Sequence, residues 1–259
     1  MDCDKKRIVV KVGTSTITHE SGKINLKRID CLARVLSDLM NMGHEIVLVS
    51  SGAIGVGAGK LGLAEKPSTT RQKQALAAIG QASLVSIYEK FFKEYGYSTG
   101  QVLLTKFVLD APERYDSARS AFETMIGYGV IPIVNENDVI STYEIEFGDN
   151  DTLSAYVANL VDADLLILMS DIDGFYNGNP NSNRAQLIPV IDEITDEIRK
   201  CAGGEGTRRG TGGMITKLNA AEIVTQKGTD MVITNGAFPE NLYKIVSGEN
   251  VGTRFMGRR

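Results

Sequence analysis

Short runs of apolar residues alternate along the chain with longer stretches in which apolar residues recur at helical spacing. The runs are rich in valine, isoleucine and leucine, which is typical of strands buried on both faces of a sheet. They predict strands over residues 7–13, 45–49, 101–105, 130–134, 165–169, 187–191, 230–234 and 251–255. In the stretches between these runs, the helical spacing of apolar residues predicts helices over residues 25–43, 68–95, 117–128, 153–162, 192–201 and 214–221. This alternation is typical of an α/β fold with a parallel sheet.

The stretch from Phe147 to Pro180 shows the pattern most clearly. Residues 148–152 place two carboxylates and a carboxamide on a turn, where they are N-cap candidates for the next helix. The buried strand at 165–169 then ends in the acidic and small residues 170–174. Because ligands of open α/β sheets bind at the carboxyl ends of the strands, we expect a ligand site at this edge.

Two details of the pattern bear on packing. Pro132 lies within the strand predicted at 130–134, and proline favours an edge strand or the end of a strand. Residues 77–82 combine alanine and glycine within a predicted helix and would permit close helix packing. We expect that packing inside the fold rather than between subunits.

Other polar residues also follow predicted strands. Lys11 lies near the end of the first strand, where a lysine is costly to bury unless an anion meets it. Residues 50–57 are rich in serine and glycine, so their amides can approach an anion. Asn135–Asp138 alone would be a polar turn, but the nearby residues 149–151 make a shared polar site the better interpretation.

A glycine-rich segment opens the last long helix. Residues 203–213 contain six glycines, and Lys217 follows one turn inside the predicted helix. A flexible surface linker is the alternative, but a glycine loop that leads directly into a helix is a natural phosphate site. Two other matches fail. Gly57–Gly62 fits the dinucleotide pattern but starts well after its strand, and a P-loop would need glycine instead of Ile54 and serine or threonine instead of Leu61.

Composition narrows the class of protein. The 259 residues are 42% hydrophobic and 23% charged, which suits one large α/β domain or two small ones. A net charge of −4 argues against a general nucleic-acid binder. Cys3, Cys31 and Cys201 lack metal-ligand spacing and are expected to be reduced thiols. Without a long apolar run or an apolar signal core, the protein is expected to be cytoplasmic and away from membranes.

The available side chains suit phosphoryl transfer. The two histidines, His19 and His44, have no evident catalytic partner, and the sequence contains neither CxxC nor HExxH. Isolated lysines, glycine-rich turns and carboxylates at strand ends provide positioning and charge neutralisation, which phosphoryl transfer chiefly requires. A carboxylate acceptor is the best fit, because with a reference pKa of about 4 it needs no general base at neutral pH.

Six motifs resemble those of the amino acid kinase family. In chain order they are Lys11–Ser15, Ser50–Ala53, Asn135–Asp138, Phe147–Asp151, Ser170–Asp171 and Gly210–Lys217. The letters NEND, GDND and GTGGM…TK most resemble the branch that phosphorylates the γ-carboxylate of L-glutamate at the start of proline biosynthesis, rather than uridylate, aspartate or acetylglutamate kinases. The resemblance covers nearly the whole chain.

The resemblance implies a three-layer αβα sandwich with a mainly parallel central sheet. Residues 1–160 would hold the amino acid and residues 161–259 the nucleotide. Many such enzymes carry an added carboxy-terminal PUA domain related to RNA-modification modules, and we expect this chain, which ends at Arg259, to lack it. Feedback inhibition by L-proline and a homo-oligomer, either a dimer or a tetramer, are also implied.

The same resemblance assigns roles to residues. Lys11 and Lys217 would neutralise the transferring phosphoryl group, with Asp151 orienting them; a simple N-cap is the alternative for Asp151. L-Glutamate would be held by Ser51, Asp138 and Asn150, with Asp138 meeting the α-ammonium. ATP would be held by Lys11, Gly13, Ser170, Asp171, Thr211, Gly212, Gly213, Met214, Ile215, Thr216 and Lys217. The amides of Gly13 and Gly52 are candidates for the γ-phosphate. Mg²⁺ would arrive with the nucleotide, so no protein metal site is expected.

Two other functions remain open on the sequence alone. Another kinase of this family could act on a different carboxylate or on a phosphate, although a phosphate acceptor would call for arginines near the acceptor loops. A non-catalytic amino-acid sensor could share the fold, although Lys11, Asp151 and Lys217 are all present.

Overall fold

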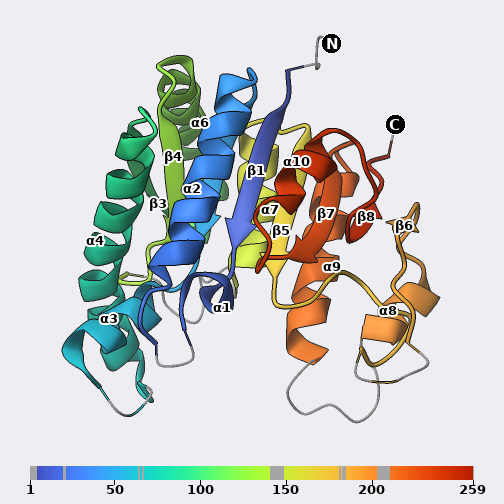
Figure 1. Ribbon diagram of the computed structural model, residues 1–259, viewed down its shortest axis with the longest axis horizontal. Helices are drawn as coiled ribbons and strands as arrows, with labels where there is room; N and C mark the ends of the chain where they lie inside the picture. The colour runs from blue at the N-terminus through green and yellow to red at the C-terminus, as the bar shows by residue number, and fades with distance from the viewer. Residues whose placement is uncertain are drawn as a thin grey trace.

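An eight-stranded sheet forms the middle layer of the computed structural model (Figure 1), which describes residues 5–19, 22–63, 65, 67–140, 149–180, 182, 185–202 and 211–258. The strand order within these residues is β3-β4-β2-β1-β5-β7-β8-β6. The strands are β1 (Arg7–Val12), β2 (Glu45–Ser50), β3 (Thr99–Leu104), β4 (Ile131–Glu136), β5 (Leu165–Ser170), β6 (Val190–Ile191), β7 (Asp230–Asn235) and β8 (Thr253–Phe255). Only the β7–β8 pair among them is antiparallel.

Helices cover both faces of the sheet. They are α1 (Thr14–Ile17), α2 (Leu26–Asn41), α3 (Ala53–Leu61), α4 (Thr70–Glu94), α5 (Lys106–Leu109), α6 (Pro112–Gly127), α7 (Asn150–Leu160), α8 (Asp196–Ala202), α9 (Thr211–Thr225) and α10 (Asn241–Val246). Ile8 and Val10 of β1 pack in one apolar core with α2, α4 and α10, whereas Val9 packs in a second core with α6, α7 and α9. The alternation of β1 side chains between two cores confirms the predicted three-layer sandwich.

Side-chain caps define where several helices begin. Asn25 accepts a hydrogen bond from the backbone of Arg28 at the start of α2. Thr69 and Gln72 form a capping box at the start of α4, in which each side chain bonds the other residue's backbone. Asp149 accepts from the Thr152 amide at 2.8 Å before α7. None of the helices in the described parts of the chain is long and apolar enough to cross a membrane.

Helix α3 is the main element that the sequence pattern does not predict. Its glycines resemble a loop, yet they allow α3 to touch α4. A Cβ atom on Gly57 would lie 2.1 Å from the carbonyl oxygen of Leu76, and one on Gly80 would lie 1.8 Å from that of Ala53. Real side chains never approach so closely, so both positions require glycine. The close packing predicted for residues 77–82 is therefore found within the fold, as expected.

Several boundaries also differ from prediction. Of the two positions predicted for Pro132, the end of a strand is confirmed, since β4 begins at Ile131, and the edge strand is not, because β4 lies between β3 and β2. Pro132 is tolerated near its beginning, since the pairs with β2 start only at Ile133. Helix α6 begins before residue 117, at Pro112, and β6 contains only Val190–Ile191. The short helices α1, α5 and α10 have too few turns to give a helical pattern.

Buried His44 should make the free energy of unfolding depend on pH. His44 is 3% exposed, and its Nδ1 accepts a hydrogen bond from the backbone N–H of Lys6. Burial, together with the nearby charge of Lys6, lowers the pKa of His44. The unfolded chain therefore binds this proton more readily than the folded protein. The stabilising contribution is complete above the unfolded pKa of about 6.5 and is lost as the pH falls through that value toward the lower folded pKa.

We expect the melting temperature of the wild type to fall more between about pH 7.5 and pH 5.5 than that of His44→Asn. The asparagine oxygen can still accept from Lys6 but cannot titrate. Thermal denaturation followed by circular dichroism measures both slopes. Identical slopes would show that His44 does not contribute to the pH dependence.

Candidate active site

Asp151 lies between two lysine side chains at the carboxyl edge of the sheet. Its Oδ1 is 2.6 Å from Nζ of Lys11, and its Oδ2 is 3.0 Å from Nζ of Lys217. Thr216 donates its hydroxyl to the same Oδ2 at 3.0 Å, and Lys217 also donates to the carbonyl oxygen of Gly213 at 3.2 Å. We call Lys11, Asp151 and Lys217 the lysine–aspartate cluster.

The lysine–aspartate cluster is buried and carries a net positive charge. Lys11 and Lys217 are each 8% exposed, and Asp151 is 4% exposed. Burial raises the pKa of Asp151, but the charges of Lys11 and Lys217 outweigh burial and hold that pKa below its usual value. The carboxylate is therefore ionised and balances one of the two ammonium groups. The remaining charge is costly to bury unless an anion enters, so the cluster suits a phosphoryl group.

The sheet topology brings these three residues together. β1, which carries Lys11, pairs with β2 on one side and with β5 on the other. The strand order reverses between β1 and β5, and ligands of open α/β sheets bind at such a reversal. Asp151 comes from the first turn of α7, and Lys217 from α9, which packs against α7. Asp149, not Asp151, is the N-cap of α7.

A network of amides fixes Asn150 next to the cluster. Its Nδ2 is 2.9 Å from Ser51 Oγ, 2.9 Å from Asn135 Oδ1 and 3.2 Å from the carbonyl oxygen of Ser50. Asn135 in turn donates to Gln81 Oε1 at 2.9 Å, and both of these side chains are buried. Ser51 and Asn150, two of the residues predicted to hold glutamate, are thus in contact. Asn135 belongs to the polar segment Asn135–Asp138 that the sequence indicated. Gln81 positions Asn135, and the sequence pattern did not reveal it.

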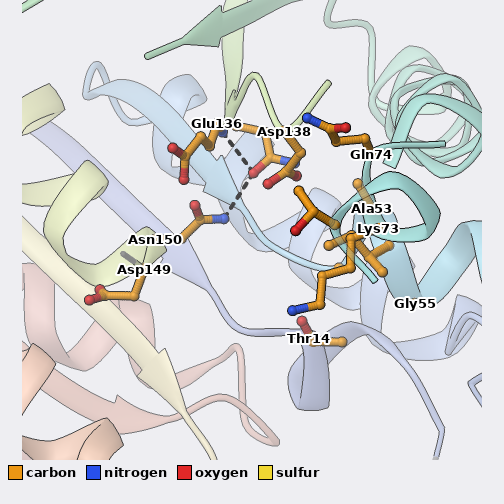
Figure 2. A pocket seen from close by; sticks show the side chains of 13 residues that line it. Thr14, Ala53, Gly55, Lys73, Gln74, Glu136, Asp138, Asp149 and Asn150 are labelled. Carbon is orange, nitrogen blue, oxygen red and sulfur yellow. Dashed lines mark hydrogen bonds between the residues drawn. The ribbon is translucent and has the colours of Figure 1, made fainter. Parts of the chain in front are cut away.

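A cleft of about 300 Å³ opens beside this network (Figure 2). It brings Asp138 and Asn150 together with residues from three helices. Its lining residues are Thr14, Gly52, Ala53, Ile54, Gly55, Thr70, Lys73, Gln74, Asn135, Glu136, Asp138, Asp149 and Asn150. Asp149 is partly buried, and burial raises the pKa of its carboxyl. The volume suits a small amino acid. Asn150 connects the cleft with the lysine–aspartate cluster, because Asp151 directly follows it in the chain.

Two other residues predicted to hold ATP, Ser170 and Asp171, lie at the end of β5, which pairs with β1 on the side away from β2. Ser170 ends β5, and its hydroxyl donates to Asp171 Oδ1 at 3.1 Å. Both residues line a second cleft, of about 440 Å³. The amide of Gly13 faces the carbonyl oxygen of Met169 at 3.4 Å, a long hydrogen bond, and an added Cβ on Gly13 would lie 3.8 Å from Nζ of Lys11.

The glycine-rich segment is described only in part. Helix α9 begins at Thr211 and continues through Gly212 and Gly213 to Lys217, so Lys217 lies deeper in the helix than the one turn predicted. Met214 packs against the core, while Ile215 is 44% exposed. Residues 203–210 and the predicted motif residues 147–148 lie outside the described residues. Nucleotide contacts at residues 211–217 therefore stay a prediction.

Among the described residues, no three His, Cys, Asp or Glu side chains are grouped so that they could hold a metal ion.

Comparison with known proteins identifies relatives over nearly the whole chain. The model of the amino acid kinase family matches residues 6–235. A glutamate 5-kinase of Clostridium perfringens is 55% identical over 99% of this chain and 97% of its own length. A glutamate 5-kinase of Caldanaerobacter subterraneus is 52% identical over 96% of this chain and 68% of its own. Carbamate kinase from Giardia lamblia bound to AMP-PNP has the same fold, with a TM-score of 0.70 at 17% identity over all of both chains. This chain belongs to the amino acid kinase family.

Proposed function

We propose that this protein transfers the γ-phosphoryl group of ATP to the γ-carboxylate of L-glutamate, the first step of proline biosynthesis. The observation that carries the proposal is the buried, net positive lysine–aspartate cluster directly beside a cleft that contains Asp138 and Asn150. The similarity to proteins named glutamate 5-kinase supports it. Among the described residues, no histidine forms a hydrogen bond or an ion pair with Lys11, Asp151 or Lys217, which also suits a carboxylate acceptor.

The reaction needs no proton transfer. A γ-carboxylate oxygen of glutamate forms a bond to the γ-phosphorus of ATP, the bond from that phosphorus to the β-phosphate oxygen breaks, and ADP leaves. Lys11 and Lys217 neutralise the charge that shifts between the two oxygens, because a preorganised ammonium needs no rearrangement as the reaction proceeds. Asp151 holds both lysines in place and prevents their mutual repulsion.

The nucleotide is proposed to lie between the cluster and the end of β5. Lys11, Gly13 and residues 211–217 would hold its phosphates, and Ser170 with Asp171 its nucleoside. Mg²⁺ would come with the phosphates and neutralise part of their charge. This fits the described residues, because a hydrated Mg²⁺ on phosphates does not require a group of protein carboxylates.

The two halves of the sheet suggest which part of the chain binds each substrate. Strands β1 to β4 form one half of the sheet and β5 to β8 the other. We propose that residues 1–160 bind glutamate and residues 161–259 bind ATP. Feedback inhibition by L-proline and assembly into a dimer or tetramer are part of the same proposal.

Trapping the product tests the function. Purified protein with ATP, Mg²⁺ and L-glutamate should release ADP, and hydroxylamine should convert the acyl phosphate into a hydroxamate. Omitting glutamate should abolish both signals, and L-aspartate serves as the control acceptor. ADP release with another acceptor but no hydroxamate from glutamate would exclude the proposed substrate.

Replacing Asp138 with alanine should weaken glutamate binding selectively. Asp138 lines the cleft and is proposed to pair with the α-ammonium of glutamate. Loss of one partner from a desolvated charge pair costs about 2–5 kcal/mol, so the KM for glutamate should rise about 30-fold or more. The KM for ATP should change little. Steady-state kinetics with each substrate varied in turn measures both values, and an unchanged KM for glutamate would restrict Asp138 to a structural role.

A further inference from the structure

Lys73 gives the glutamate cleft its positive charge. Of the described residues that line the cleft, Lys73 alone has a cationic side chain, whereas Glu136, Asp138 and Asp149 are acidic. Figure 2 shows its side chain extending from α4 into the cleft. Within the described parts of the chain, no carboxylate forms an ion pair with its ammonium group.

The position of Lys73 is fixed by the helix that carries it. The capping box of Thr69 and Gln72 defines the first turn of α4, and Lys73 follows directly. Its backbone N–H bonds the carbonyl oxygen of Thr69 at 3.0 Å. Farther along α4, Gly80 packs so closely on α3 that an added Cβ would lie 1.8 Å from the carbonyl oxygen of Ala53. The backbone that carries Lys73 is therefore held by a helix cap and by a close contact between α4 and α3.

The chemistry of the proposed substrate requires such a group. Glutamate carries two carboxylates, and the γ-carboxylate must reach the lysine–aspartate cluster. The α-carboxylate and the α-ammonium share one carbon atom, so a partner for the α-carboxylate must lie in the same cleft as Asp138. The first residues of α3 also line this cleft, and the start of a helix favours an anion.

We propose that Lys73 is a specificity-determining residue that binds the α-carboxylate of the amino-acid substrate. This inference rests on the proposed function for the identity of the substrate. Together, Asp138 and Lys73 distinguish an α-amino acid from a simple carboxylate, since each pairs with one charge of the zwitterion. The lysine acts on binding, and the lysine–aspartate cluster acts on the chemical step.

A neutral ligand analogue separates this role from a structural one. L-Isoglutamine keeps the ammonium and the γ-carboxylate of glutamate but has a carboxamide in place of the α-carboxylate. Isothermal titration calorimetry without turnover should show that the wild type binds L-glutamate at least about tenfold more tightly than L-isoglutamine. Lys73→Met, which keeps the apolar stem, should reduce this preference to about twofold or less by weakening glutamate alone.

Two variants serve as controls. Lys73→Arg retains the charge and should keep most of the preference for glutamate. Lys90→Met removes an exposed lysine from the same helix, outside the cleft, and should match the wild type. The proposal is overturned if the wild type shows no preference between the ligands, or if Lys73→Met weakens both equally. The proposed function fails by a different result, the absence of a hydroxamate from the wild type.

Discussion

Replacing Lys217 with alanine should lower kcat by about 10²- to 10³-fold while the protein stays folded and still binds nucleotide. The ammonium of Lys217 lies 3.0 Å from Asp151 and is nearly buried, so no solvent cation can readily replace it. Only interactions that strengthen in the transition state accelerate the chemistry, and Lys217 is proposed to neutralise the charge that shifts toward ADP. The fold should tolerate the change, because Lys11 still pairs with Asp151.

Steady-state kinetics beside circular dichroism measures this effect. Lys217→Arg should restore little activity, because the planar guanidinium differs from an ammonium in reach and geometry. Lys227→Ala, which removes an exposed lysine shortly after α9, is the matched control and should keep the wild-type rate. Wild-type kcat in Lys217→Ala would remove this lysine from the mechanism.

Asp151→Asn should reduce both activity and stability. The substitution leaves two buried ammonium groups beside a neutral amide, and removing one partner of a buried ion pair costs about 3–5 kcal/mol. For a chain of this size, the melting temperature should fall by roughly 6 °C or more. Catalysis should fall by about 10²-fold or more, because the repelling lysines lose their common position.

The cause of the loss can be checked with pH and a neighbouring variant. Since the pKa of Asp151 is lowered in the folded protein, its contribution is complete above the unfolded pKa of about 4 and is lost as the pH falls through the folded value. The wild type and Asp151→Asn should therefore converge in stability at acid pH. Asp149→Asn keeps an N-cap residue and should melt close to the wild type at neutral pH. Equal stability of all three proteins at pH 7 would contradict the argument.

The sheet and its flanking helices could be predicted because their patterns are local. Most strands of the sheet contain a short apolar run, as in Leu165–Met169 of β5, and α2 and α4 each keep one apolar face. Helix α3 could not be predicted in this way, because its glycines are dictated by a neighbour, α4, that is distant in the sequence. A local pattern of apolar and polar residues shows whether a residue faces solvent or the apolar core, but not which other element it contacts.

Some residues of the candidate site could likewise be predicted from the sequence, and others could not. The resemblance to a family pointed to Lys11, Asp151 and Lys217, and the structure brings these three together. Gln81 and Lys73 were not predicted, because each is a single polar residue on a helix. In the sequence, such residues look like the many polar residues on the exposed faces of helices. Only the register of α4 against β4 and α3 shows that one contacts Asn135 and the other lines the cleft.

The lysine–aspartate cluster also has a consequence for how the protein reaches its native state. Its members come from β1, α7 and α9. Lys11 is therefore synthesised long before Asp151 and Lys217, its partners in the cluster. Contacts between residues so distant in sequence form only after long loops have closed, which is slow. The ion pairs of the cluster therefore belong to the late stages of folding. A nascent chain that ends before α9 lacks Lys217, so we expect it to have an incomplete lysine–aspartate cluster and no kinase activity.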